Sequence, residues 1–170
     1  MTTLGSLTSP RGTDGVSVGP LDMNPFVDED MLSGAQVVEV RLDAIRSLLS
    51  VVLELRVSEG HWEAGAGLLV AEEVHGFSWS QEDRGHMETA WTALSSSPRG
   101  AAQGLALRLS GTPTFSLSFI ARRATFFTSQ IERLEGTAPP DYGEIEASAS
   151  HPDIPNWNSA AACFKAAYYP

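Results

Sequence analysis

The 170-residue sequence has one cysteine, one lysine and no long apolar run, and each of these shortages excludes a class of protein. Cys163 cannot form an intrachain disulfide, and a lone thiol is prone to intermolecular pairing in an oxidising compartment. Residues 1–20 lack the apolar stretch of a signal peptide, and no run elsewhere approaches the ~20 residues of a membrane-spanning helix. We therefore expect a cytoplasmic protein with no export signal and no membrane anchor.

Basic residues are also scarce, since 11 Lys and Arg stand against 21 Asp and Glu and give a net charge of −10. Nucleic-acid binding depends on clustered basic side chains that release counterions from phosphates, so the composition disfavours a nucleic-acid ligand. The acidic residues gathered toward both ends of the chain either keep the protein soluble or contact a basic protein partner. The apolar share of 42% and the mean hydropathy of −0.08 exclude a wholly disordered chain, a collagen and a coiled coil.

Composition divides the chain into three parts. Residues 1–34 are rich in Gly, Ser, Thr, Pro and Asp and keep no period of 2 or 3.6, which predicts a flexible acidic leader. Residues 35–135 form the expected antiparallel β domain. Residues 136–170 begin as a Pro-rich acidic loop, and their Ala-rich and aromatic end predicts a docked C-terminal segment with a short helix in 160–169.

Strand periodicity is the main structural signal of the central part. Apolar residues alternate with polar ones in 36–42, 51–57, 105–109 and 115–119, and a bulge near Gly76 is expected because Val74 is out of phase with Phe77. Ser95 to Pro98 is expected to end the strand that holds Trp91. The pattern predicts a mainly β fold, with six to seven antiparallel strands in a sandwich or open barrel. The alternative is an α+β fold, a sheet backed by the terminal segments.

No motif identifies a catalytic or cofactor site. His61, Glu73 and His75 are of the types that bind metals, but metal sites usually show a close ligand pair plus a third ligand, and no second close pair follows. There is no complete phosphate-binding loop and no Gly-x-Ser-x-Gly nucleophile motif. We therefore expect neither a metal nor a cofactor, and we assign no catalytic residue.

An acidic segment with a tyrosine is the best candidate for partner binding. Carboxylates around an exposed aromatic side chain suit a basic surface, which predicts binding of a basic protein. The alternative for this segment is a solvated loop whose Tyr142 packs on the body. The residues that we predict to bind the partner are Glu72, Glu73, Asp141, Tyr142 and Glu144.

Two other function classes stay open. The first is an enzyme or small-ligand carrier with a pocket inside the sandwich or barrel, formed by His61, Trp62, His75, Trp79 and Trp91. The second is a structural or accessory subunit of a larger assembly, for which Trp157, Phe164 and Tyr169 would be exposed on an isolated chain.

Several short segments together carry a resemblance to a known family. These segments lie at 77–80 (FSWS), 89–92 (TAWT), 104–109, 123–127 (RATFF) and 139–144 (PPDYGE). Over residues 36–146 the chain resembles an uncharacterised actinobacterial family of small acidic β-rich proteins, which implies a cytoplasmic bacterial origin. It is also loosely similar to immunity proteins of polymorphic toxin systems, which bind a cognate toxin through an acidic surface. No motif is specific to them, so no binding residue carries over from that similarity.

Overall fold

The structure is a computed structural model that describes residues 2–9, 12–82, 90–142 and 152–169. Strands make up 53% of the chain, and the only helices in the described residues are two 3-10 turns, η1 (Gly5–Thr8) and η2 (Glu132–Leu134). The prediction of a mainly β chain is confirmed. The strands are β1 (Val18–Pro20), β2 (Gln36–Asp43), β3 (Leu48–Glu54), β4 (Ala66–Gln81), β5 (Trp91–Ala101), β6 (Gly104–Thr112), β7 (Phe115–Gln130) and β8 (Ala162–Tyr169).

All eight strands belong to one sheet, in the order β1-β8-β7-β4-β3-β2-β5-β6. Strand β6 also pairs with β7, so the strands from β2 to β7 close a ring of pairings. The shortest pairing in the ring is that of β2 with β5, which pair only at Gln36↔Thr92 and Val37↔Trp91. Every pairing is antiparallel except that of β1 with β8.

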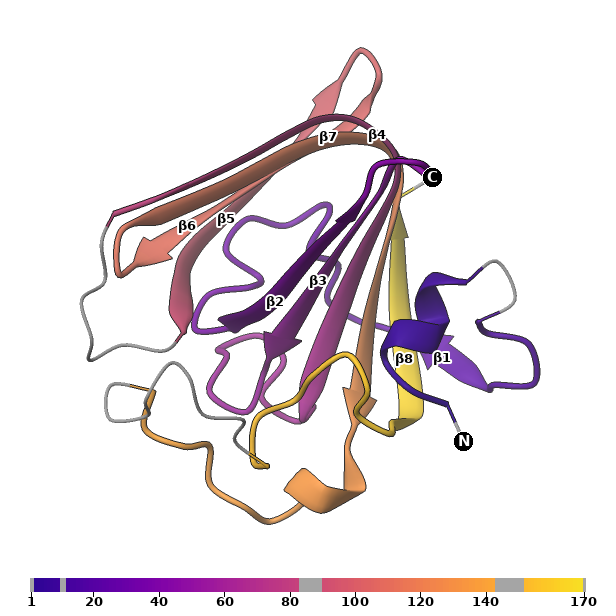
Figure 1. Ribbon diagram of the computed structural model, residues 1–170, viewed down its shortest axis with the longest axis vertical. Coiled ribbons are helices and arrows are strands. Elements are labelled where there is room, and N and C mark those ends of the chain that lie inside the picture. Colours follow the sequence, from indigo (N-terminus) through magenta and orange to yellow (C-terminus); the bar gives the residue numbers. More distant parts are fainter. Residues whose placement is uncertain (1, 10–11, 83–89, 143–151, 170) are drawn as a thin grey trace.

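The two longest strands, β4 and β7, pass through both layers of this folded sheet. Each has 16 residues, and they stay paired with each other through a sharp bend, seen at the upper right of Figure 1. Their register shifts between Val74 and Gly76, which confirms the expected bulge and supplies the bend.

Two apolar cores lie on opposite faces of β3. The larger fills the space between the layers and includes Leu49, Leu53 and Phe119. The second lies on the outer face of β3, β4, β7 and β8, where Leu4 and Leu7 are buried. The sequence predicts a flexible leader in 1–34, whereas the structure packs Leu4 and Leu7 of this segment against the sheet. Burial of each large apolar side chain contributes about 1.5 to 3 kcal/mol, which favours this packing.

The C-terminal helix expected in 160–169 is wrong, because Ala162–Tyr169 forms strand β8 between β7 and β1. Phe164 and Ala166 are buried in the second core, whereas Lys165 and Tyr168 are exposed. Alanine favours helices in isolation, but pairing with two strands and burial of alternate side chains override that weak preference.

Strand β5 likewise continues through Ser95 to Pro98, where the sequence predicts a turn. Pro98 lies opposite Leu107 of β6, and β5 pairs with β2 only at residues 91 and 92. Proline cannot donate a backbone hydrogen bond, and it is tolerated here because no strand of the described residues pairs with this part of β5 on its other side.

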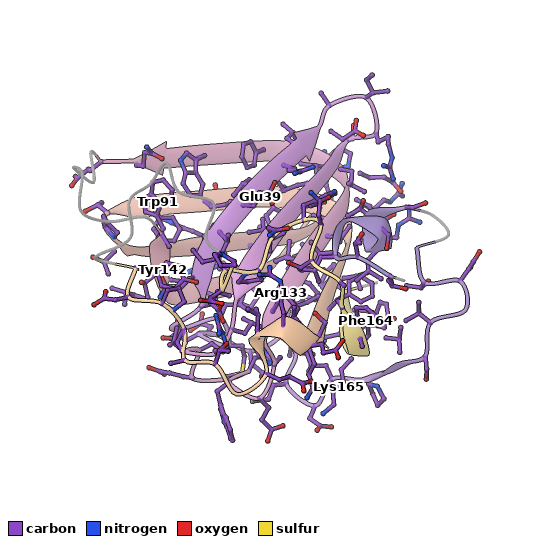
Figure 2. All side chains as sticks on the ribbon, turned by 60° about the horizontal axis from the view of Figure 1, so that its bottom comes forward. Glu39, Trp91, Arg133, Tyr142, Phe164 and Lys165 are labelled. Atoms are coloured by element: carbon purple, nitrogen blue, oxygen red, sulfur yellow. The ribbon has the colours of Figure 1, made fainter. Side chains whose placement is uncertain are left out.

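The segment 152–161 crosses the outer face of the sheet between Glu39 and Arg133 (Figure 2). The backbone N–H of Trp157 donates to Oε2 of Glu39 at 3.1 Å, and Cζ of Arg41 lies 4.3 Å from the centroid of the Trp157 ring. Arg133 donates from Nη2 to the carbonyl oxygen of Ile154 at 2.9 Å. These contacts fasten the segment to β2 and η2.

Replacement of Arg41 with glutamine is therefore expected to lower the free energy of unfolding by about 1 kcal/mol, because the cation–π contact with Trp157 and the ion pair with Glu39 are both lost. Urea titration followed by tryptophan fluorescence measures the change. Arg99→Gln is the matched control, since Arg99 is exposed and makes no cation–π contact or ion pair with any described residue. Equal effects of the two substitutions would contradict a specific contact between Arg41 and Trp157.

Candidate functional site

Glu72 and Glu73, predicted to bind a basic partner, lie at the bend of β4 and are paired with arginines of β7. Arg123 lies 3.4 Å from Glu72 and 3.0 Å from Glu73, and Arg122 lies 3.3 Å from Glu73. All four side chains are largely exposed, so each pair is weak. Two positive charges nevertheless balance the two negative ones, and the bend offers no free acidic patch.

Tyr142 lies at the opposite end of β3 from these glutamates. Its hydroxyl donates to Oε2 of Glu54 at 3.4 Å, and burial together with the Glu54 carboxylate raises the pKa of Tyr142 above its ordinary value. Glu72 of β4 pairs with Leu48, which begins β3, whereas Glu54 ends β3. At the usual rise per residue, the two ends of β3 are about 20 Å apart. Asp141 is exposed beside Tyr142, and Glu144 lies outside the described residues. The predicted partner-binding set is therefore divided.

Glu54 and Arg56 form a buried ion pair that the sequence interpretation missed. Glu54 is 0% exposed and the Arg56 side chain 10%, and the pair is bidentate, with Nε to Oε1 at 2.9 Å and Nη2 to Oε2 at 2.7 Å. Burial lowers the pKa of Arg56, but the hydrogen bond and charge of Glu54 outweigh burial and raise it. Opposite charges two residues apart on one strand share a face, which is the signal that could have revealed the pair.

Arg56 also connects this pair to distant parts of the chain. It donates from Nη1 to the carbonyl oxygen of Thr137 at 3.1 Å and from Nη2 to that of Asp153 at 2.6 Å. Tyr142 reaches the same Glu54 carboxylate. The pair therefore fastens the segments after β7 to the end of β3, and it has a structural role.

Residues of the predicted pocket are divided between three places. Trp79 and Trp91 contact each other edge to face at 5.2 Å between centroids, and Trp79 stacks on Phe115 at 5.5 Å. The two tryptophans line a hollow of about 400 Å³ with Val37 and Val40. His75 is exposed at the bulge, and His61 and Trp62 lie together on the loop between β3 and β4.

This loop carries the most exposed aromatic side chain of the described residues. Trp62 is 65% exposed and lies between two cavities of about 310 and 320 Å³. We call its surroundings the Trp62 surface, which consists of Asp22, Met23, Trp62, Glu63 and Glu135, all exposed. The surface thus combines a large aromatic side chain with carboxylates and hollows.

The carboxylates of the Trp62 surface are not neutralised. Among the described residues, no ion pair involves Asp22, Glu63 or Glu135. Arg56 lines the second cavity but is bonded to Glu54, and Lys165 lines the first. The surface therefore has a net negative charge.

His61 is buried beside this surface, at 5% exposure, with its ring 5.2 Å from that of Phe126. Burial lowers its pKa from 6.5 to about 4, so the imidazole is neutral at pH 7. Its Nε2 and the Oγ of Ser129 are buried without a hydrogen-bond partner among the described residues. Both residues border the 310 Å³ cavity, but these two atoms are shielded from it.

Other features of the described residues bear on the open alternatives. No group of three or more His, Cys, Asp and Glu side chains is placed to hold a metal ion, within the residues that the structure describes. The described parts also contain no helix with the length and apolar character needed to cross a membrane. Phe164 is buried, and Trp157 and Tyr169 are partly buried, so the exposed aromatic face that would favour a subunit role is not present there.

No protein-family model, no curated protein and no solved structure matches the chain.

Proposed function

We propose that the chain is a non-catalytic protein-binding module that docks a basic protein partner on the Trp62 surface. The observation that carries the proposal is the exposure of Trp62, at 65%, between two cavities and among carboxylates that lack ion-pair partners in the described residues. An inhibitor or immunity-like role is the form of this function that the loose similarity to immunity proteins suggests.

Physical chemistry supports each part of the proposal. Burial of the exposed tryptophan ring in an interface is favourable, and tryptophan is among the residues that contribute most to binding. The net charge of −10 attracts a basic partner over long range, and local carboxylates orient it. The two cavities beside Trp62 can accept side chains of the partner. The proposed binding surface therefore lies around the loop between β3 and β4, and not at Asp141 and Tyr142 as the sequence predicts.

Replacing Trp62 with alanine is expected to weaken partner binding by about 30-fold, since an anchoring tryptophan contributes about 2 kcal/mol or more. The partner is first captured from host lysate at low and moderate salt and identified. Its affinity for each purified variant is then measured by calorimetry. Glu63→Gln with Glu135→Gln is expected to slow association and to weaken its dependence on salt.

The double variant Glu72→Gln with Glu73→Gln is the matched control, because it removes the same charge at the paired bend of β4. It is expected to leave the affinity close to that of the unmodified chain. Loss of binding in this control with normal binding by Trp62→Ala would contradict the proposed surface. Association that does not respond to salt would contradict the role of charge.

A further inference from the structure

A hollow of about 760 Å³ lies on the outer face of the layer that β4, β5, β6 and β7 form, which is the upper layer in Figure 1. On β6, Ala106 and Arg108 alternate with Leu107 and Leu109. The two leucines are buried in the core between the layers, so Ala106 and Arg108 point outward. The volume of the hollow is within the range for small-molecule sites.

A row of polar side chains crosses this hollow from one strand to the next. Arg108 of β6 pairs with Ser97 of β5 on one side and with Ser118 of β7 on the other. Ser118 pairs in turn with Ser78 of β4. Directly paired residues have their side chains on the same face, so three hydroxyls and one guanidinium share this row. The three hydroxyls make no hydrogen bond to any described residue, which leaves them available to a ligand.

Arg99 of β5 belongs to the next row and is a diagonal neighbour of Arg108. It pairs with Ala106 of β6, which pairs with Ile120 of β7. Diagonal neighbours on paired strands are about 7 to 8 Å apart, so both guanidinium groups are within reach of one small ligand. The two arginines and Ile120 therefore form the walls of the hollow, and small side chains such as Ala106 and Ser97 form its floor.

The hollow is positively charged, although the chain as a whole is acidic. The chain has 21 Asp and Glu, but none of the described residues that border the hollow is acidic. Arg99 and Arg108 are exposed and form no ion pair with any described residue. Arg108 donates from Nε to Oγ of Ser116 at 3.2 Å, and its two terminal amino groups make no bond to the described residues. An anion between the two arginines would relieve their mutual repulsion.

We propose that this hollow binds a small organic phosphate of the sugar-phosphate class. The phosphate group is held between Arg99 and Arg108, because guanidinium groups bind phosphate oxygens in a bidentate manner. The serine hydroxyls of the polar row can each donate and accept a hydrogen bond, which suits the hydroxyls of a sugar. The described border has no carboxylate for an ammonium group, which favours a sugar over an amino acid as the body of the ligand. Ile120 contacts its carbon atoms.

This site goes beyond the proposed protein-binding function, because the hollow shares no bordering residue with the two cavities beside Trp62. The two proposals can therefore be tested separately.

The test is calorimetric titration of the purified full chain without any partner protein. The probes are phosphate esters of ribose, glucose and fructose, compared with inorganic phosphate, the unphosphorylated sugars and a phosphoserine peptide. At least one sugar phosphate is expected to bind at least about tenfold more tightly than inorganic phosphate and than its own unphosphorylated sugar. The proposal would be overturned if no sugar phosphate bound, if inorganic phosphate bound equally well, or if the phosphoserine peptide bound more tightly.

Arg99→Gln and Arg108→Gln are each expected to weaken binding of that sugar phosphate by about tenfold or more. Ala106→Phe keeps both charges but fills the floor of the hollow, so it is expected to abolish binding. Arg46→Gln is the matched control, because Arg46 is also exposed but lies between β2 and β3, away from the hollow. Undiminished binding by Arg108→Gln, or an equal loss in Arg46→Gln, would overturn the proposal. Trp62→Ala is expected to bind normally.

Discussion

Replacing Glu54 with glutamine is expected to destabilise the fold by about 3 to 5 kcal/mol, because it leaves the Arg56 guanidinium buried without its counter-charge. The carboxylate is 0% exposed and accepts both hydrogen bonds of the bidentate pair, as well as one from Tyr142. Water has little access to replace it. Chemical denaturation measures the change, and the near-ultraviolet circular dichroism at zero denaturant shows whether the variant is still folded.

Glu73→Gln is the comparison for this prediction, since its carboxylate pairs with Arg122 and Arg123 on the surface and its loss should cost at most about 1 kcal/mol. Replacing both Glu54 and Arg56 with methionine should cost less than Glu54→Gln, because no unpaired charge is left behind. A Glu54→Gln variant as stable as Glu73→Gln would mean that the guanidinium is solvated, and the fastening role of the pair would then fail.

The sequence predicts the strands of this fold better than it predicts how far they extend. Alternation within 36–42 and 105–109 is local information, and strands β2 and β6 lie there. The extension of β5 past Pro98 and the strand character of Ala162–Tyr169 depend on neighbours that are distant in sequence. Local propensity favours a turn and a helix at these positions, and pairing overrides it.

The candidate site shows the same division between local and distant information. Composition indicates an acidic chain with exposed aromatic residues, but it does not say which aromatic residue is exposed. Tyr142 packs against Glu54 because the buried pair draws the segment after β7 onto the sheet, whereas Trp62 projects from a loop and has little covering it. The burial of His61 depends on contact with Phe126 of β7, which lies 65 residues further along the chain. Such contacts cannot be read from spacing.

The stability of the chain is expected to fall by about 3 kcal/mol as the pH decreases from 6.5 to 4, through His61 alone. The folded state lowers the pKa of His61 from 6.5 to about 4, and each pKa unit corresponds to about 1.4 kcal/mol. Between these two values the unfolded chain binds a proton that the folded chain does not, so protonation favours unfolding. The contribution is fully present above pH 6.5 and fully lost below pH 4.

Comparison with His61→Phe separates this effect from the titration of carboxylates, because the carboxylates are common to both proteins. The difference in unfolding free energy between the two is therefore expected to shift with pH in this window and to stay constant outside it. An NMR titration of the His61 ring gives an independent measure, with an expected midpoint near pH 4. A midpoint near 6.5 would show that water reaches the His61 ring and solvates the imidazolium. In that case Nε2 would be hydrogen-bonded to solvent, and the stability of the chain would not depend on His61 between pH 6.5 and 4.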